Sequence, residues 1–287
     1  MPTLKFQARG PLVSLLNSFL VHLGFRADSN DYFGGETSEG TKQLQTWLIE
    51  QDRKNRKGRI QVDGIAGNQT LGYACGIDRN DNFSPESIAI ALDVTYPARN
   101  PNLNQAPDQA FQEAMFGFID YKPAPTDSNP ERIKIINDFV EKNIVVAKIP
   151  QIIGKANAPA SGQLRLHRLV APQLLALFAA WESVGILGLI STFDGLWEPR
   201  FVRGSQARLS NHSWGTAFDI NASANWLNHL PAFPGENGCL FPHVEIAQDY
   251  GFNWGGFYRS RLDGMHFEAV KILSADELQS VNDRYLD

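Results

Sequence analysis

LSNHSWGTAFDIN, residues 209–221, is the most informative stretch of this sequence. It ends in a predicted strand. Alternate side chains of a strand point to the same face, so Ala217 and Asp219 are expected on one face of this strand. His212 and Asp219 are both residue types that bind a borderline metal such as zinc. A catalytic zinc ion takes three protein ligands and keeps one position open for water. The stretch therefore predicts part of a zinc site, which needs a second histidine from elsewhere in the chain.

A second histidine, with carboxylates beside it, lies downstream. Residues 251–258, GFNWGGFY, lead into residues 263–268, DGMHFE. This segment supplies His266, with Asp263 three residues before it and Glu268 two residues after it. Hydrolysis at a zinc ion requires a general base close to the metal, and a carboxylate can provide one. The two segments together predict a three-ligand metal site with a base.

The pattern Ser210-x-His212-x-x-Gly215-x-Ala217-x-Asp219, followed by Asp263-x-x-His266-x-Glu268, resembles the D-alanyl-D-alanine carboxypeptidase/VanY group of zinc peptidases. Relatives in this group include phage endolysins that cleave L-alanyl–D-glutamate bonds. The resemblance covers about residues 111–287. It implies an α+β domain in which a small antiparallel sheet carries the zinc site and helices pack on one side. Zinc-bearing domains of the Hedgehog type, which bind partners without catalysis, share this fold.

Carried over to the matching positions, the resemblance implies that His212, Asp219 and His266 are the zinc ligands. Asp263 takes the position of the catalytic carboxylate, which accepts the proton of the attacking water and later gives it to the leaving amine. Many carboxypeptidases of the group have Glu at this position, whereas Asp is more like the endolysin endopeptidases. This departure leaves the cleaved bond open between D-alanine release, the L-Ala–D-Glu bond and a cross-link.

Arginines precede the zinc motif in the family, and Arg200 and Arg203 do so here. One of them is expected to face the substrate carbonyl or a carboxylate. The placement of Arg203 before Gly204 and Ser205 favours Arg203, which would stabilise the oxyanion together with the zinc ion. Ser210 is expected to hydrogen-bond the substrate or to orient the site. Glu268 and Ser210 are the candidates for groups that orient the zinc ligands without binding the metal themselves.

Residues 11–75 predict three helices. Apolar residues recur at helical spacing before Gly24, which stands where a C-terminal cap belongs. We expect a second helix over about residues 38–51, capped at its start by Thr37. A turn over residues 62–71 leads into a short third helix.

This arrangement resembles the three-helix peptidoglycan-binding domain that is fused to many cell-wall hydrolases. The matching residues are Phe33-Gly34-x-x-Thr37, Gln45 and Trp47 of the central helix, and Asp63-Gly64-Ile65-Ala66-Gly67-x-x-Thr70. The resemblance implies that this part of the chain binds peptidoglycan, and a three-helix bundle without a ligand is the alternative. The basic run over residues 53–59 is typical of a solvated loop, although it could favour an anionic wall polymer.

The chain is expected to divide into three parts. A peptidoglycan-binding-like helical domain takes residues 1–78, a proline-rich linker takes residues 79–110, and a zinc peptidase domain takes residues 111–287. Within the last part, apolar spacing predicts helices over about residues 130–143 and 172–184.

Several other side chains have ordinary structural explanations. Four histidines lack ligand spacing, two tryptophans are expected in the core, and two cysteines are too few for a disulfide framework and are expected to be buried. These residues are His22, His167, His229, His243, Trp214, Trp254, Cys75 and Cys239.

Composition narrows the classes of partner. The formal net charge is −5, from 26 Lys and Arg against 31 Asp and Glu, which argues against nucleic acid as the main partner. The longest apolar run, around residues 174–180, is too short to span a bilayer, so we expect no membrane insertion.

The first residues show no basic segment followed by an apolar core, so no signal peptide is expected. A monomer is expected.

These features together predict an enzyme that hydrolyses peptide bonds of the peptidoglycan stem or cross-link with zinc, and so lyses the cell wall. The helical domain would raise the local substrate concentration by holding the enzyme at the wall. The alternative is a non-catalytic zinc-containing wall-binding or signalling module. Asp263 argues against it, because a structural zinc site needs no base.

An intracellular D,D-dipeptidase is a third possibility, although a soluble dipeptide would need no anchoring domain. Without a signal peptide, the enzyme would reach the wall as a phage endolysin released through a holin, or as an effector delivered by a secretion machine.

Overall fold

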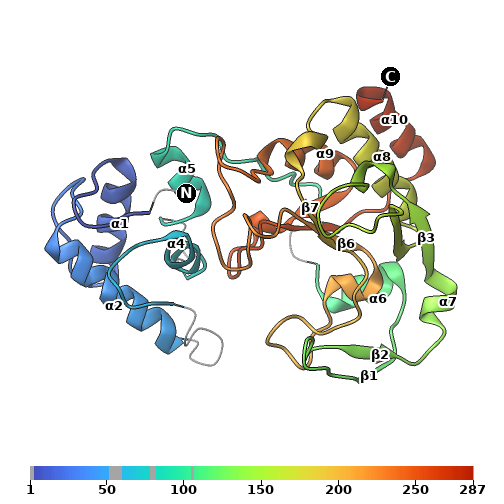
Figure 1. The fold of residues 1–287 in the computed structure, drawn as a ribbon, viewed down its shortest axis with the longest axis horizontal. Helices are drawn as coiled ribbons and strands as arrows, with labels where there is room; N and C mark the ends of the chain where they lie inside the picture. Colours follow the sequence, from blue (N-terminus) through green and yellow to red (C-terminus); the bar gives the residue numbers. More distant parts are fainter. Residues whose placement is uncertain (1–2, 52–59, 78–81, 105–106, 287) are drawn as a thin grey trace. The chain divides into compact units, whose positions relative to one another are not determined.

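The chain forms two compact units in a computed structural model that describes residues 3–51, 60–77, 82–104 and 107–286 (Figure 1). The first unit takes the chain up to Pro97 and two later segments, Asn225–Cys239 and Tyr258–Gly264. The second unit takes the remaining segments, Ala98–Ala224, Leu240–Phe257 and Met265–Asp287. The basic run over residues 53–59 lies outside the described residues.

Helices make up the framework of the first unit. They are α1 (Pro11–His22), α2 (Gly35–Gln51), α4 (Asn68–Cys75) and α5 (Pro85–Ala91). Helix α1 packs against α2 and α5, and α2 packs against α4. Gly24 follows the last turn of α1 with a φ of +77°, the left-handed conformation that glycine adopts after a helix. Helices therefore form in the three regions where the sequence predicts them, and α5 is a further helix among the described residues.

The start of α2 differs from the prediction. The helix begins at Gly35, so Thr37 lies inside its first turn and is not the cap. The Asp28 carboxylate does that work from the preceding loop, because it accepts hydrogen bonds from the backbone N–H groups of Gly34 and Thr37 at 2.7 and 2.8 Å. Burial would raise the pKa of Asp28, but the hydrogen bonds from Thr37 and Gly34 outweigh it and hold the pKa below its ordinary value.

The Asp63-Gly64 turn is held by Gln45, a buried residue of α2. The Gln45 side-chain oxygen accepts hydrogen bonds from the backbone N–H groups of Asp63 and Gly64 at 3.1 and 3.0 Å. Its amide nitrogen donates to Asp63 Oδ1 and to the Ile65 carbonyl at 2.9 and 3.0 Å. Gly64 has a φ of +74°, which suits glycine. Gln45 and the turn therefore have a structural role, which explains this part of the sequence pattern without a ligand.

The first unit reaches beyond the helical region expected at residues 1–78. Helix α5 lies inside the expected linker over residues 79–110 and packs on α1. Segment 225–239 approaches α4 so closely that a Cβ on Gly72 would lie 2.5 Å from the Asn228 carbonyl oxygen. The unit is thus assembled from segments distant in the sequence.

The second unit is an α+β structure with small antiparallel sheets. Its helices are α6 (Gln109–Phe116), α7 (Phe139–Asn143), α8 (Ala171–Ser183), α9 (Phe241–Asp249) and α10 (Ala275–Tyr285), with short 3₁₀ turns η1 (Pro150–Ile152), η2 (Leu187–Leu189), η3 (Asn211–Trp214) and η4 (Gly255–Phe257). Its strands are β1 (Tyr121–Pro123), β2 (Ile133–Ile135), β3 (Ile144–Lys148), β4 (Gln163–His167), β5 (Phe193–Gly195), β6 (Ala217–Ile220), β7 (Phe252–Trp254) and β8 (His266–Ala269). Strands β1 and β2 form one pair and β3 and β4 another, while the largest sheet has the order β5-β6-β8-β7.

Helix α8 covers one face of the four-stranded sheet. It confirms the helix predicted over residues 172–184, and its Phe178 ring lies 5.7 Å from the Phe218 ring of β6. Trp181 of the same helix lies 6.0 Å from Phe267 of β8. Because Phe218 and Phe267 pair across β6 and β8, the side chains of their neighbours point to the opposite face. No helix within the described ranges is both long and apolar enough to cross a membrane.

The predicted helix over residues 130–143 is wrong. Residues 133–135 form β2, which pairs with β1, and only residues 139–143 form a helix, α7. Ile133 is buried while Lys134 is exposed, the alternation of a strand, and Ile136 is half exposed to solvent. The apolar spacing therefore reflects a short strand followed by a separate helical turn.

Candidate metal centre

The loop that carries His212 is fixed by backbone geometry. His212 lies in η3, and Gly215 follows with a φ of +70° before β6 begins. A Cβ on Gly215 would lie 2.9 Å from the His167 backbone nitrogen, so only glycine fits this turn. The turn lies between His212 and β6, the strand that carries Asp219.

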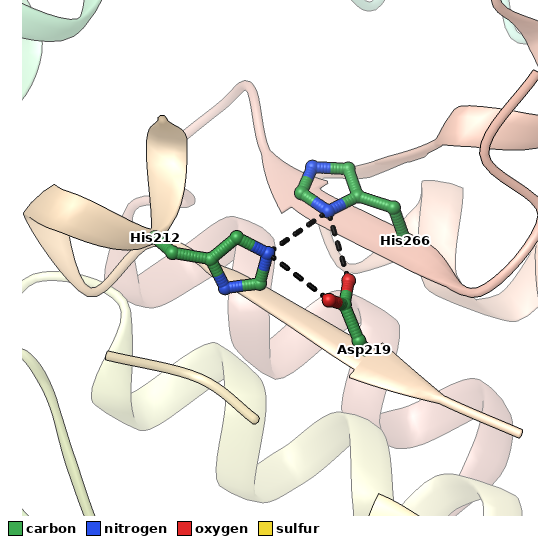
Figure 2. Close-up of side chains that lie close together, drawn as sticks. All are labelled: His212, Asp219 and His266. Carbon is green, nitrogen blue, oxygen red and sulfur yellow. Dashed lines mark hydrogen bonds and ion pairs between the residues drawn. The ribbon is translucent and has the colours of Figure 1, made fainter. Parts of the chain in front are cut away.

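Three side chains, His212, Asp219 and His266, converge on the face of the sheet opposite α8 (Figure 2). Asp219 and His266 are cross-strand partners on β6 and β8. The Nδ1 atom of His266 lies 3.0 Å from Asp219 Oδ1 and 3.2 Å from His212 Nε2. His212 Nε2 lies 3.3 Å from Asp219 Oδ2.

These distances fit a tetrahedral metal ion. Nitrogen and oxygen ligands about 2.0–2.1 Å from a tetrahedral zinc ion lie about 3.3 Å from one another. The two imidazole nitrogens lie 3.2 Å apart, and each lies close to that distance from a different carboxylate oxygen of Asp219, His266 at 3.0 Å from Oδ1 and His212 at 3.3 Å from Oδ2. Two imidazoles and one carboxylate are also a donor set suited to zinc, with a further position left for water. Within the described ranges, this is the one group of His, Cys, Asp or Glu side chains with the geometry to hold a metal ion.

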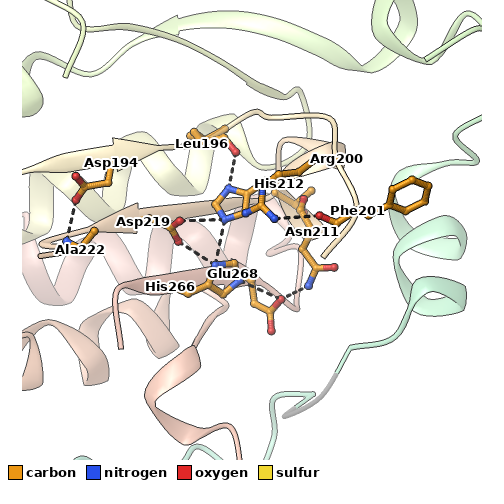
Figure 3. Close-up of polar contacts among 11 residues, drawn as sticks. Asp194, Leu196, Arg200, Phe201, Asn211, His212, Asp219, Ala222, His266 and Glu268 are labelled. Atoms are coloured by element: carbon orange, nitrogen blue, oxygen red, sulfur yellow. Dashed lines mark hydrogen bonds and ion pairs between the residues drawn. The ribbon is translucent and has the colours of Figure 1, made fainter. Parts of the chain in front are cut away.

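Neighbouring groups orient both imidazole rings (Figure 3). The Leu196 carbonyl oxygen lies 2.8 Å from His212 Nδ1, so in the neutral ring Nδ1 carries the proton and Nε2 has the lone pair. On the other ring, Glu268 Oε2 lies 3.6 Å from His266 Nε2, which leaves Nδ1 facing the other two side chains. The Asn211 side chain donates a hydrogen bond to Glu268. Partners of this kind fix the ring orientation of metal-binding histidines.

The charges of the cluster favour a cation. Burial opposes the charged forms of Asp219 and His266, but their mutual contacts outweigh it. The pKa of Asp219 is lowered by His212 and His266, and the pKa of His266 is raised well above its ordinary value by Asp219 and Glu268. Glu268 is fully buried. Two carboxylates therefore hold a positive charge at His266, which a metal ion would replace.

The remaining site residues of the sequence prediction have different surroundings. Ser210 is buried at the start of η3, and its backbone N–H donates to the Arg200 carbonyl at 2.9 Å. Arg203 is exposed, whereas Arg200 is half-buried. Asp263 is half-buried in segment 258–264, which belongs to the first unit, so its role as the base stays a prediction.

Sequence reasoning missed Leu196 and Asn211. Leu196 contacts His212 through its backbone carbonyl, which every residue type has, so the sequence does not indicate this contact. Asn211 stands beside His212 in the motif, so its polar side chain was visible, but its partner Glu268 is distant in the sequence.

The other histidines and cysteines lie elsewhere. His167 and His243 are buried, and burial lowers the pKa of each to about 4, so both are neutral core residues near pH 7. Cys239 is half-buried, contrary to the expectation that both cysteines are buried, whereas Cys75 is buried. The tryptophans expected in the core, Trp214 and Trp254, are fully buried.

Comparison with known proteins finds one family model that matches the part of the chain that carries these side chains. Residues 203–269 match the family model of D-alanyl-D-alanine carboxypeptidase. The matched segment contains His212, Asp219 and His266 as well as Asp263. No curated protein and no solved structure matches the chain. The match supports a peptidase of this kind, and such peptidases are generally zinc-dependent.

Zinc affinity should depend steeply on pH. Because Asp219 and Glu268 raise the pKa of His266 in the metal-free protein, zinc must displace a proton to bind there. Below that pKa, we expect the Kd for zinc to rise about tenfold for each unit by which the pH falls. Competition with a chelator at pH 6, 7 and 8 measures this slope.

Substitutions provide the control for this measurement. His266→Ala should abolish tight binding, and His22→Ala, on the exposed side of α1, should behave like the parent chain. An affinity that is the same at all three pH values would contradict the proton–zinc exchange.

Proposed function

We propose that this protein hydrolyses a peptide bond of the peptidoglycan stem or cross-link, with a zinc ion held by His212, Asp219 and His266. The observation that carries the proposal is the convergence of these three side chains inside the segment that matches the carboxypeptidase family. A zinc ion held there would supply Lewis acidity and lower the pKa of water toward neutrality. The chain's own residues supply ligand orientation, proton transfer and charge stabilisation.

Asp263 is the proposed general base. It stands three residues before His266, the position at which the family carries its catalytic carboxylate. In this role the carboxylate takes the proton from the attacking water and then gives it to the nitrogen of the leaving amine. The carboxylate thus returns to its starting state after each turnover.

Arg200 is a stronger candidate than Arg203 for stabilising the oxyanion. The backbone of Arg200 is tied to the His212 loop, because its N–H donates to Ser213 Oγ at 3.0 Å and its carbonyl accepts from the same hydroxyl at 2.9 Å. The Arg200 guanidinium is itself held by a hydrogen bond that it donates to the Phe201 carbonyl at 3.1 Å (Figure 3). A cation held near the ligands favours negative charge that develops on the substrate oxygen.

The first unit is proposed to hold the enzyme at the cell wall. A groove of about 380 Å³ between α1 and α5 combines hydroxyl and apolar side chains, which suit a peptide or a sugar. Its lining includes Ser14, Leu15, Ser18, Ser87 and Ile90. Attachment through this groove would raise the substrate concentration near the metal site. The enzyme would then act on the bacterial wall after holin release or delivery by a secretion machine.

The test of the hydrolytic function is digestion of purified peptidoglycan, with mass spectrometry of the released muropeptides. We expect the zinc-loaded chain to shorten or separate stem peptides, and the masses identify the cleaved bond. Asp263→Asn should keep zinc and lower turnover about a hundredfold or more, because the proton acceptor is lost. Asp276→Asn, an exposed substitution on α10, is the control. A zinc-loaded parent that cleaves nothing would instead indicate the non-catalytic module.

The same assay separates the two arginines. Arg200→Gln should lower kcat/KM about a hundredfold, the usual cost of removing one group that stabilises an oxyanion. Arg203→Gln, at an exposed position, should change it less than about threefold. The reverse ranking would return the role to Arg203.

Wall attachment is tested by sedimentation with purified sacculi. The full chain should pellet with sacculi, and Ser18→Arg should reduce pelleting because the new side chain fills the groove. Thr46→Arg, on the exposed side of α2, should pellet like the parent. Equal pelleting of both variants would rule out the groove, and a parent that stays in solution would rule out wall attachment.

A further inference from the structure

A second pocket lies beside the metal centre, in the same unit. It has a volume of about 290 Å³ and is formed by β4, β5 and the residues around them. It adjoins the ligand group because Gly195 on its wall pairs with Asp219, and because the Leu196 carbonyl, also on its wall, contacts His212. Figure 3 shows Leu196 next to His212, and Asp194 farther from the ligand group, bonded to Ala222. A substrate bound at the metal would therefore extend a neighbouring group into this pocket.

Arg165 supplies a positive charge to the pocket. Its guanidinium lies 3.9 Å from the centre of the Trp197 ring, and Trp197 is itself held by a hydrogen bond from its Nε1 to the Ser213 carbonyl at 3.2 Å. Stacking on an aromatic face leaves the edge of a guanidinium free to bind a carboxylate through two hydrogen bonds. Arg165 has no ion-pair partner among the residues that the structure describes.

Asp194 supplies a negative charge to the same pocket. Its carboxylate is held by hydrogen bonds from the Asn157 side chain at 2.7 Å, from the Ala222 backbone N–H at 2.9 Å and from the Thr192 hydroxyl. A carboxylate has about four acceptor positions, so these three bonds leave room for another donor. In the described part of the chain, no Lys or Arg forms an ion pair with Asp194. The pocket thus presents one positive charge, on Arg165, and one negative charge, on Asp194.

We propose that this pocket binds a substrate side chain that ends in both an ammonium and a carboxylate, as in a diaminopimelate residue of the stem peptide. Arg165 receives the carboxylate and Asp194 receives the ammonium. The pocket then selects diaminopimelate-type peptidoglycan over the lysine type, which has the ammonium alone. This inference rests on the proposed hydrolysis of stem peptides and names the substrate class for the same site.

The two charges and the volume distinguish this occupant from simpler ones. A free C-terminal carboxylate of D-alanine would pair with Arg165 but would meet the Asp194 carboxylate without compensation. A lysine ammonium would pair with Asp194 and leave Arg165 unused. A volume of about 290 Å³ is also far more than the methyl group of alanine fills. A group with both charges on one carbon satisfies Arg165 and Asp194 together.

The test compares two stem peptides that differ only in having diaminopimelate or lysine at the third position. We expect the zinc-loaded parent to cleave the diaminopimelate peptide with a kcat/KM at least about tenfold higher. Arg165→Gln should remove this preference by lowering the value for the diaminopimelate peptide alone. Arg168→Gln, another exposed arginine nearby in sequence, should keep the preference.

Calorimetric binding provides a readout that does not require turnover. The two peptides are titrated into the full chain carrying Asp263→Asn, with and without Arg165→Gln, and the same preference for diaminopimelate should appear and disappear. The inference is overturned if Arg165→Gln leaves both peptides unchanged, or weakens both equally, in kinetics and in binding. If the parent cleaves neither peptide, the proposed function fails, while calorimetry still decides the specificity of the pocket.

Discussion

The pairing of Asp219 on β6 with His266 on β8 is the constraint from which the arrangement of the metal centre follows. Because side chains alternate along a strand, this register sends Asp219, His266 and Glu268 to one face of the sheet. It sends Phe218 and Phe267 to the other face, under α8. A shift of one residue would exchange the polar and aromatic sets. The packing that stabilises the sheet therefore also fixes the positions of Asp219 and His266.

A charge requirement follows from the same arrangement. Asp219 and Glu268 place two carboxylates against His266, and Glu268 is fully buried. Buried charge without compensation costs several kcal/mol, so the group needs a positive charge at its centre. A proton on His266 meets that need, and a divalent cation held by the three side chains would meet it as well. Metal binding and protonation would thus be alternatives at one position.

The sequence predicts the ligand set more fully than its surroundings. His212 and Asp219 lie within one short turn and strand, so their relation is local and can be read from spacing. The carbonyl of Leu196 has no residue signature, and its place beside His212 depends on how β5 pairs with β6. The helix predicted over residues 130–143 does not form for a similar reason, since Ile133 and Ile136 follow a helical spacing but Ile133 pairs with β1. Contacts between distant segments decide such cases.

The most direct test of the metal centre is anomalous X-ray diffraction at the zinc absorption edge, on crystals of the zinc-loaded full chain. The account predicts one anomalous peak between His212 Nε2, His266 Nδ1 and the Asp219 carboxylate, about 2.0–2.2 Å from each. A peak at another place in the chain, or no peak at these three side chains with zinc in excess, would contradict it.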